Sequence, residues 1–496
     1  MTDATASTYD ELPYEHLAYY HTHPSNLAVV ATLCGLDPPP LDGCRVLELG
    51  CGAGFNLLAM AESLPNSRFV GVDLAERQIA DGRAVAAAIG TDRVELLARD
   101  ISGIGGSLGP FDYVVAHGVL SWVPPDVGEA LLATCRQSLA PGGIAYVSYN
   151  TYPGWHLRTI IRDVLLFHAP PSAPPLERVR AARSALERML GDLPEPESNY
   201  GRLLRSEVEG LRADADEYVF HEFLETDNRP LRFEEFARAA AAHGLRFFSE
   251  ARFGTSPDTQ PEAVQRALAA VSDDPVRREQ YLDHLMNRSF RQSLLRRAES
   301  APPRAPSLEA VGRLRILCRV ELLDDLDGER DGRERFRLDG ERVIQTGDAP
   351  LRAILHALRR AGPRPLPVAE LAAAASRLID AGIPPSGRAA ERFFLPRVVR
   401  GYADGLWQLF AHEPPTAQEP PERPLAPALA RHAAGRGPKV TNLLHGPVVL
   451  AEEDRAVLRR LDGLTTRSGL AASLSLGPEA VERSLGRLVE AALIAR

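Results

Sequence analysis

The sequence predicts an α/β protein whose first half forms a large, mostly parallel sheet covered by helices on both faces. Short apolar strands alternate with helical stretches from residue 41 onward, which is the pattern of strand–helix–strand units. The first of these strands runs into a glycine-rich turn that opens a helix. With 496 residues, the chain has room for about three domains, and we expect this sheet to form the first.

The expected elements follow in a regular order after a helical leader at residues 9–36 and a proline-rich turn. Short apolar runs predict the strands, and longer stretches, often ended by glycine, predict the helices between them. We expect strands at 45–50, 68–74, 94–101, 111–120 and 144–150, and helices at 55–65, 76–90 and 126–143. Strands at 217–224 and 245–253, separated by a helix at 232–244, complete a sheet of seven strands.

The remaining sequence predicts further domains. Helical sequence punctuated by prolines at 170–213 indicates an insertion over the carboxyl edge of the sheet, where ligands bind in such folds. Beyond the sheet, strands and helices in a compact order predict winged-helix-like α+β units. We therefore expect a helical N-terminal lid at 1–40, the sheet domain at 41–253, a helical regulatory connector at 254–305, a winged-helix-like domain at 306–415, a Pro-rich linker at 416–437 and a second winged-helix-like domain at 438–496.

Composition narrows the possible functions. The net charge of -9 argues against binding to nucleic acids or to an anionic membrane surface. The five cysteines form no CxxC pair, so neither a disulfide framework nor a zinc ribbon is indicated. The sequence contains neither a secretory signal pattern nor an apolar run long enough for a transmembrane helix. We therefore expect a cytoplasmic protein with no membrane partner.

The segment VLELGCGAGFN, residues 46–56, carries the strongest chemical signal. Its glycines allow the backbone to approach a ligand, but the spacing is not that of a dinucleotide-binding loop. Glu48 precedes the turn and suits a ligand with an ammonium group. Asp73 ends the second strand at the spacing from which a carboxylate reaches a ribose diol, and Asp100 ends the third strand, where it can meet an adenine amino group.

With these motifs, residues 41–253 resemble the class I S-adenosylmethionine-dependent methyltransferases, which have a Rossmann-like seven-stranded sheet. YHTHPSN, AHGVLSWVPP, YVSYNTYPGW, FHEFLETDNRP and QYLDHLMNRSFRQSLL extend the resemblance to bacterial methyltransferases with a methyltransferase regulatory domain, including the rickettsial outer-membrane-protein lysine methyltransferases. The resemblance implies S-adenosyl-L-methionine as cofactor. The donor-binding residues it implies are Glu48, Gly50, Gly52, Gly54 and Asn56 around the methionine part, Asp73 and Leu74 around the ribose, Asp100 and Ile101 around the adenine, and His117 beside the methyl group.

Residues that follow the fourth and fifth strands are candidates for the acceptor site, because both strand exits lie at the carboxyl edge of the sheet. We expect His117 to be the general base or an anchor of its loop. Tyr149 and Asn150 are expected to orient the acceptor. Aromatic faces attract cations, so Trp122, Tyr152 and Trp155 are candidate acceptor contacts, although Trp122 and Trp155 also suit core packing.

The YHTHPSN segment of the leader, residues 20–26, is expected to close the cavity. Tyr20, His21, His23 and Asn26 would shape the acceptor opening, and an exposed helical turn is the alternative. No further metal ligands fall at suitable spacing, so we expect no metal site.

Three functions remain open from the sequence. The first is methylation of lysine amines in a protein acceptor, with which the single lysine of the chain, Lys439, agrees, although base composition explains the arginine bias equally well. The second is methylation of a small molecule or peptide in secondary metabolism. The third is a scaffold that binds the donor without turnover. The oligomeric state is not predicted.

Overall fold

The computed structural model describes residues 11–12, 18–323, 333–340, 342–362, 364–379 and 388–496. Its largest element is a seven-stranded sheet with the order β3-β2-β1-β4-β5-β7-β6. Strands β3, β2, β1, β4 and β5 run parallel, and β7 pairs antiparallel with both β5 and β6. The strands are β1 (Arg45–Leu49), β2 (Arg68–Asp73), β3 (Val94–Ala98), β4 (Phe111–Ala116), β5 (Leu139–Asn150), β6 (Leu245–Glu250) and β7 (Phe290–Arg297).

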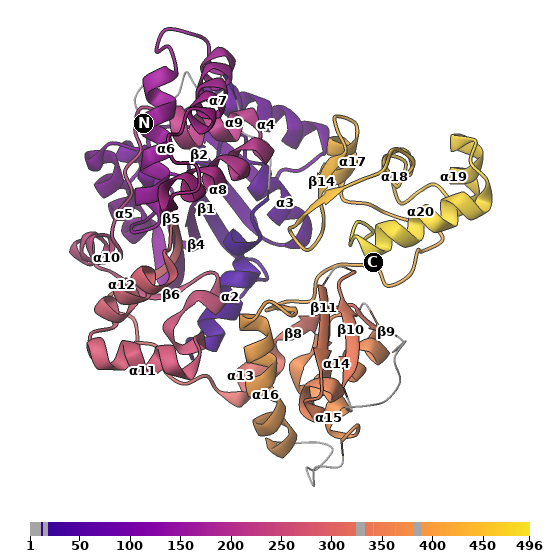
Figure 1. The fold of residues 1–496 in the computed structure, drawn as a ribbon. Helices are drawn as coiled ribbons and strands as arrows, with labels where there is room; N and C mark the ends of the chain where they lie inside the picture. The colour runs from indigo at the N-terminus through magenta and orange to yellow at the C-terminus, as the bar shows by residue number, and fades with distance from the viewer. Residues whose placement is uncertain (1–10, 13–17, 324–332, 341, 363, 380–387) are drawn as a thin grey trace.

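Helices cover both faces of this sheet (Figure 1). Apolar strand residues are buried on the two faces in two separate core clusters, as the near-continuous apolar runs predict for a parallel sheet. The helices between the strands are α3 (Phe55–Ser63), α4 (Glu76–Ala88) and α5 (Pro125–Ser138), and α10 (Phe233–Ala242) precedes β6. The Rossmann-like seven-stranded sheet is therefore confirmed.

Two expected elements were wrong. Residues 217–224, expected as a strand, form the end of α9 (Asp216–Val219) and a π-helical turn, η4 (Phe220–Leu224). Residues 290–297, expected to continue a helix, form β7 between β5 and β6. The sheet consequently uses residues well beyond 253, where we expected the sheet domain to end.

The insertion is helical, as expected, whereas the connector predicted at 254–305 is helical only in part because it also contains β7. The insertion contains α7 (Pro175–Gly191) and α8 (Asn199–Ala213), and α6 (Trp155–His168) leads into it from β5. Helices α6, α7, α8 and η4 share an apolar core of their own. The connector contains α11 (Glu262–Val271) and α12 (Pro275–Met286) before it enters β7.

A middle unit follows the sheet. It holds α13 (Leu308–Arg313), β8 (Arg315–Leu317), β9 (Val320–Leu323), β10 (Glu334–Leu338), β11 (Arg342–Thr346), α14 (Ala349–Ala361), β12 (Leu366–Pro367), α15 (Val368–Ser376), α16 (Arg388–Ala403) and β13 (Gln408–Phe410). Two three-stranded sheets and their helices enclose a core cluster that is separate from those of the large sheet.

The C-terminal unit contains α17 (Ala428–Ala434), β14 (Lys439–Thr441), β15 (Pro447–Val449), α18 (Glu452–Leu458), α19 (Arg467–Leu474) and α20 (Pro478–Glu490) around one apolar core. Part of the expected linker at 416–437 is thus the folded helix α17, which packs beside α3 of the sheet domain (Figure 1). Among the described residues, no helix combines the length and the apolarity needed to cross a membrane.

The described part of the leader is buried between the sheet domain and the middle unit. A short 3-10 turn, η1 (Tyr20–Thr22), precedes α2 (Pro24–Leu33), and every residue of α2 is buried. Leu27 packs in a core cluster of the large sheet, whereas Val29 packs in the core of the middle unit. Residues 1–10 and 13–17 of the expected lid lie outside the described residues.

Candidate active site

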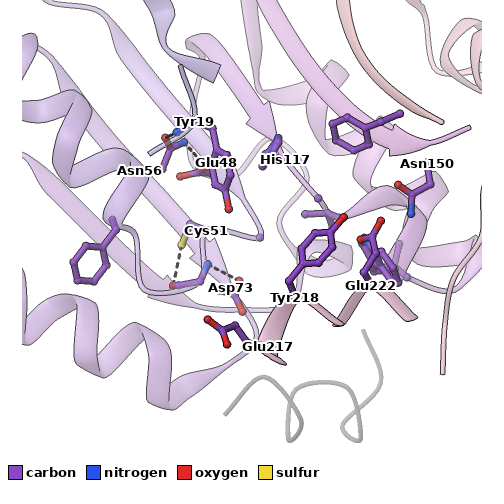
Figure 2. A pocket seen from close by; sticks show the side chains of 18 of the residues that line it. Tyr19, Glu48, Cys51, Asn56, Asp73, His117, Asn150, Glu217, Tyr218 and Glu222 are labelled. Atoms are coloured by element: carbon purple, nitrogen blue, oxygen red, sulfur yellow. Dashed lines mark hydrogen bonds between the residues drawn. The ribbon is translucent and has the colours of Figure 1, made fainter. Parts of the chain in front are cut away.

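A cavity of about 610 Å³ opens at the carboxyl ends of β1, β2, β4 and β5. One half is formed by the glycine-rich turn after β1 and by Asp73 at the end of β2. The other half is formed by residues after β4 and β5 and by α9 and η4 (Figure 2). The cavity lies at the sheet edge where the sequence places the donor.

The glycine-rich turn requires glycine for its backbone and for its packing. Gly50, Gly52 and Gly54 have φ values of 74°, 53° and 72°, in the left-handed region that other residues rarely adopt. A Cβ atom on Gly50 would lie 2.4 Å from Cγ2 of Val119. The turn therefore presents bare backbone to the cavity at the start of α3.

Glu48 supplies a buried carboxylate to this half of the cavity. Its Oε1 accepts a hydrogen bond of 2.7 Å from Nδ2 of Asn56. Its Oε2 is buried and has no hydrogen-bond partner among the described residues. Burial raises the pKa of Glu48 to about 8, against the opposing effect of the Asn56 hydrogen bond. A buried carboxylate oxygen with a free acceptor site fits a ligand that carries an ammonium group.

Asp73 holds the turn and the start of the next segment together. Its Oδ2 accepts a hydrogen bond of 2.8 Å from the Gly52 backbone N–H, and its Oδ1 accepts one of 2.9 Å from that of Ala75. Because these bonds fix the carboxylate at the cavity wall, Asp73 is placed to meet a ribose diol there. Glycine turn, Glu48 and Asp73 together fit the amino-acid and ribose parts of S-adenosylmethionine.

His117 lies at the wall between the two halves of the cavity. Its ring is 4.1 Å from that of Tyr19, measured between centroids, and its Nδ1 is 2.9 Å from the hydroxyl oxygen of Tyr146. Burial, with a smaller effect of His21, lowers the pKa of His117 to about 4. The imidazole is therefore neutral at physiological pH.

The outer half of the cavity is polar and aromatic. Asn150, Trp122 and Trp155 line it, as expected from the sequence, and the Asn150 amide nitrogen is buried with no hydrogen-bond partner in the described residues. Glu222 on η4 faces this space (Figure 2), and its carboxylate pairs with Arg158 at 3.1 Å. Burial raises the pKa of Glu222 to about 7, while Arg158 opposes the shift.

Several predicted site residues lie elsewhere. The Tyr149 ring stacks on Phe236 at 4.3 Å and its hydroxyl is 3.4 Å from Ser293 Oγ, so we withdraw Tyr149 from the acceptor site. Tyr20 donates a hydrogen bond to the Leu409 carbonyl in the middle unit, and His23 is buried beside Ser63. These two residues, with Tyr152, are not among the residues that line the cavity. Tyr20 and His23 lie away from the cavity because this part of the leader packs between domains, and the acceptor contact expected of Tyr152 stays a prediction.

Gly54, Leu74, Asp100 and Ile101 are also not among the lining residues. Gly54 caps α3, and Asp100 accepts a hydrogen bond from the Ser102 backbone N–H. Both positions remain at the same edge of the sheet, after β1 and β3. The adenine contacts expected of Asp100 and Ile101 stay predictions.

Sequence reasoning missed part of the cavity wall. In the leader, Tyr19 lines the cavity, whereas the predicted Tyr20 does not. Gln78, on α4, lines the donor side. Part of the outer wall comes from the FHEFLETD segment. Because we expected a strand there, Glu222 was not predicted as a site residue. Other missed lining residues include Arg158, Glu217, Tyr218, Ser289 and Phe290. In the part of the chain that the structure describes, no group of three or more His, Cys, Asp and Glu side chains could hold a metal ion.

Comparisons with known proteins agree with this site. Residues 46–143 match the methyltransferase domain family, residues 215–297 the predicted methyltransferase regulatory domain, and residues 422–485 the PKMT C-terminal winged helix domain. The uncharacterized protein RP789 of Rickettsia prowazekii is 31% identical over 98% of this chain and 89% of its own length. The chain belongs to the class I S-adenosylmethionine-dependent methyltransferases with a methyltransferase regulatory domain.

Two further Rickettsia proteins are similar to this chain. A second Rickettsia prowazekii protein, RP028, is 37% identical over 47% of this chain and 93% of its own length. PKMT2 from Rickettsia typhi has a similar structure, with a TM-score of 0.83, 26% identity, and coverage of 97% of this chain and 100% of that chain. That protein has also been solved in complex with AdoHcy. The chain is thus an S-adenosylmethionine-dependent methyltransferase, and its C-terminal unit is a winged helix domain.

Proposed function

We propose that this methyltransferase transfers the methyl group of S-adenosylmethionine to lysine amines of a protein acceptor. The donor supplies a methyl group on a sulfonium, which a neutral amine can attack. Glu48, Asp73, Glu217 and Glu222 line the cavity, whereas Arg158 is the basic residue of its wall. An excess of carboxylates favours a cationic acceptor such as a lysine side chain.

The main support for this proposal is the position of Glu222 in the cavity wall together with its raised pKa. A lysine must lose a proton before its amine can attack, and a base works best when its pKa lies near the working pH. The pKa of Glu222 is about 7, and that of a free lysine is about 10.4. Burial of the lysine amine in the cavity lowers its pKa toward that of Glu222. Glu222 is therefore matched both to attract the ammonium and to receive its proton.

His117 serves a different role in this proposal. With a pKa of about 4, its neutral ring is a much weaker proton acceptor than Glu222. Its contacts with Tyr19 and Tyr146 suit a residue that holds the wall of the cavity beside the donor. We assign His117 to positioning. Asn150, with its unpaired amide nitrogen, is assigned to hydrogen bonding with the acceptor.

The comparisons lend support of a different kind. The structurally similar protein from Rickettsia typhi is named PKMT2, and the C-terminal domain matches a winged helix domain described for PKMT proteins. Two domains beyond the sheet also add surface next to the catalytic domain that a large acceptor could use.

The alternative is a small-molecule or peptide acceptor. A cavity of about 610 Å³ falls within the range typical of small-molecule sites, about 300–1,000 Å³. The donor takes up part of this volume, which leaves room for a side chain or a compact molecule. The charge of the outer wall favours the lysine side chain.

A methyl-transfer assay with labelled donor distinguishes these proposals. The probe is a pool of lysine-containing peptides and a matched pool in which arginine replaces lysine. We expect label on lysine Nζ atoms by mass spectrometry, and we expect Glu222→Gln to reduce transfer at least about tenfold. Binding of AdoHcy should change less than about threefold.

The control is Glu209→Gln, which removes one carboxylate from the exposed face of α8. It should leave transfer at the wild-type level. Equal labelling of both pools, or full activity of Glu222→Gln, would contradict the proposal.

A further inference from the structure

The winged helix domain reaches into the donor site through one side chain. Residues 442–446 form the turn between β14 and β15, and His445 at this turn is 2% exposed. Its Nε2 lies 2.8 Å from Oδ1 of Asn56, in the first turn of α3. Asn56 is the residue that holds Glu48. A residue near the end of the chain therefore lies two hydrogen bonds from the carboxylate that faces the donor.

Asn56 connects three parts of the chain. Its Oδ1 accepts a hydrogen bond from the Tyr19 backbone N–H at 3.2 Å, besides the shorter contact with His445. Its Nδ2 donates to Glu48 Oε1 at 2.7 Å and to Thr22 Oγ1 at 3.0 Å, and the Thr22 hydroxyl donates to the Tyr19 carbonyl. The amide has one favourable orientation, because the reversed amide would set Nδ2 against the Tyr19 backbone N–H, which is itself a donor.

The turn is built to deliver His445 to this position. Asn442 Oδ1 accepts hydrogen bonds from the backbone N–H groups of Leu444 and Gly446, and Asn442 Nδ2 donates to the Ala491 carbonyl. His445 itself has a φ of 62°, in the left-handed region. Tertiary contacts must hold a non-glycine residue in this conformation. Both the turn and its anchor to α20 direct the imidazole toward Asn56.

We propose that His445 is a positioning residue for the donor site, and that the winged helix domain sets donor affinity through His445, Asn56 and Glu48. Docking of the domain orders the Asn56 amide, which in turn holds Glu48 Oε1 and leaves Oε2 directed at the donor. Coupling of this kind is reciprocal, so the donor must also stabilise the docking of the domain. The inference depends on the placement of the donor ammonium against Glu48.

A second contact between the same two domains provides the control. Glu62, in the last turn of α3, accepts a hydrogen bond of 2.9 Å from the backbone N–H of Leu429, at the start of α17. This contact joins the winged helix domain to α3 without touching Asn56. Loss of Glu62 therefore removes one contact of the docked domain and leaves the link from His445 to Glu48 in place, whereas loss of His445 breaks that link.

The test measures AdoHcy affinity of the full chain by calorimetry. His445→Asn keeps a residue that tolerates the left-handed conformation but is too short to reach Asn56, and it should weaken binding at least tenfold. His445→Gln places an amide nitrogen near the position of the imidazole Nε2 and should restore binding to within threefold of wild type. Glu62→Ala should lower the unfolding temperature and leave AdoHcy affinity within threefold.

Hydrogen exchange of residues 438–450 tests whether the donor stabilises docking of the winged helix domain. AdoHcy should slow exchange there in the wild type and not in His445→Asn. Unchanged affinity of His445→Asn, or equal losses in His445→Asn and Glu62→Ala, would overturn the inference. Glu48→Gln tests the donor placement separately: if it weakens binding while His445→Asn does not, only the coupling fails.

Discussion

At the scale of single residues, the donor half of the cavity depends on Glu48 being buried with one carboxylate oxygen unsatisfied. The pKa of this carboxyl is raised to about 8 by burial, so the group carries its proton in the free protein at neutral pH. The proton is released from the unfolded chain at a much lower pH. Glu48 therefore favours the folded state most below about pH 4.5, and this contribution is lost as the pH rises to about 8.

This shift predicts that donor binding releases a proton. A cationic ligand favours the ionised carboxylate, so AdoHcy affinity should rise by up to about tenfold per pH unit between about pH 6 and pH 7.5. Calorimetry in buffers of different ionisation enthalpy should detect close to one proton released at pH 7. Glu48→Gln should bind more weakly and lose both the slope and the proton. A wild-type affinity that is flat over this range would show that Glu48 does not meet the ammonium.

Asp73 offers a second residue-scale prediction. Asp73→Ala removes the ribose contact and also the acceptors of the Gly52 and Ala75 backbone N–H groups. We expect AdoHcy affinity to fall at least about tenfold, since hydrogen bonds to a charged group contribute about 1.5–3 kcal/mol. The free energy of unfolding should fall by about 1–3 kcal/mol in the same variant. Asp100→Ala, at the end of the neighbouring strand, should weaken binding with a smaller loss of stability, because it removes the acceptor of one backbone N–H instead of two.

At the scale of elements, the sequence predicted the five parallel strands and the helices between them because each carries its own local pattern. It failed at β7 because the strand buries Arg291, which a local pattern interprets as a solvent-exposed helical position. The partners of that arginine, Glu250, Glu279 and Asp283, lie on β6 and α12. The prediction of a strand at 217–224 was wrong for a different reason. The spacing of the aromatic residues there is typical of a strand, but the structure buries adjacent side chains in a π-helical turn. Glu222 was missed for the same reason.

The buried ion cluster predicts how firmly β7 is held. Arg291 donates to Glu250 Oε1 at 2.7 Å, to Glu279 Oε2 at 2.9 Å and to Asp283 Oδ2 at 2.9 Å. Arg291→Leu leaves Glu250 without a cation and leaves Glu279 and Asp283 with Arg288 alone, so the free energy of unfolding in denaturant should fall by about 3–5 kcal/mol. The control is Arg266→Leu, which breaks an exposed pair with Glu262 and should cost less than about 1 kcal/mol. Similar small losses in both variants would contradict a structural role for the cluster.

At the scale of the whole molecule, the domains contact one another through segments that the sequence did not predict to lie between domains. The leader was expected to be a lid, yet α2 lies between the sheet domain and the middle unit (Figure 1). Asn26 binds both sides: its Nδ2 donates to the Ala251 carbonyl, and its Oδ1 accepts from the Tyr402 hydroxyl. Composition cannot reveal such a joint, because a helix buried by two domains looks the same in sequence as one buried by a single core.

This arrangement predicts that the sheet domain and the middle unit unfold together. Leu27 packs toward the sheet and Val29 toward the middle unit, and both are 0% exposed. Leu27→Ala should cost about 2–5 kcal/mol, and Val29→Ala somewhat less because it removes a smaller volume. If α2 couples the two units, each substitution lowers the unfolding temperature of both. The three tryptophans allow this to be observed, since Trp122 and Trp155 report on the sheet domain and Trp407 on the middle unit.

Trp407→Phe and the double variant Trp122→Phe/Trp155→Phe give separate fluorescence signals for the two units. In each background, Leu27→Ala and Val29→Ala should shift the thermal transition in the same direction. Ala28→Gly, at a buried position between the two, should destabilise both units by about 1 kcal/mol through helix propensity, and the loss of a buried methyl group adds about 0.8 kcal/mol. If Val29→Ala moves only the Trp407 signal and Leu27→Ala only the other, the two units unfold independently and α2 is a passive linker.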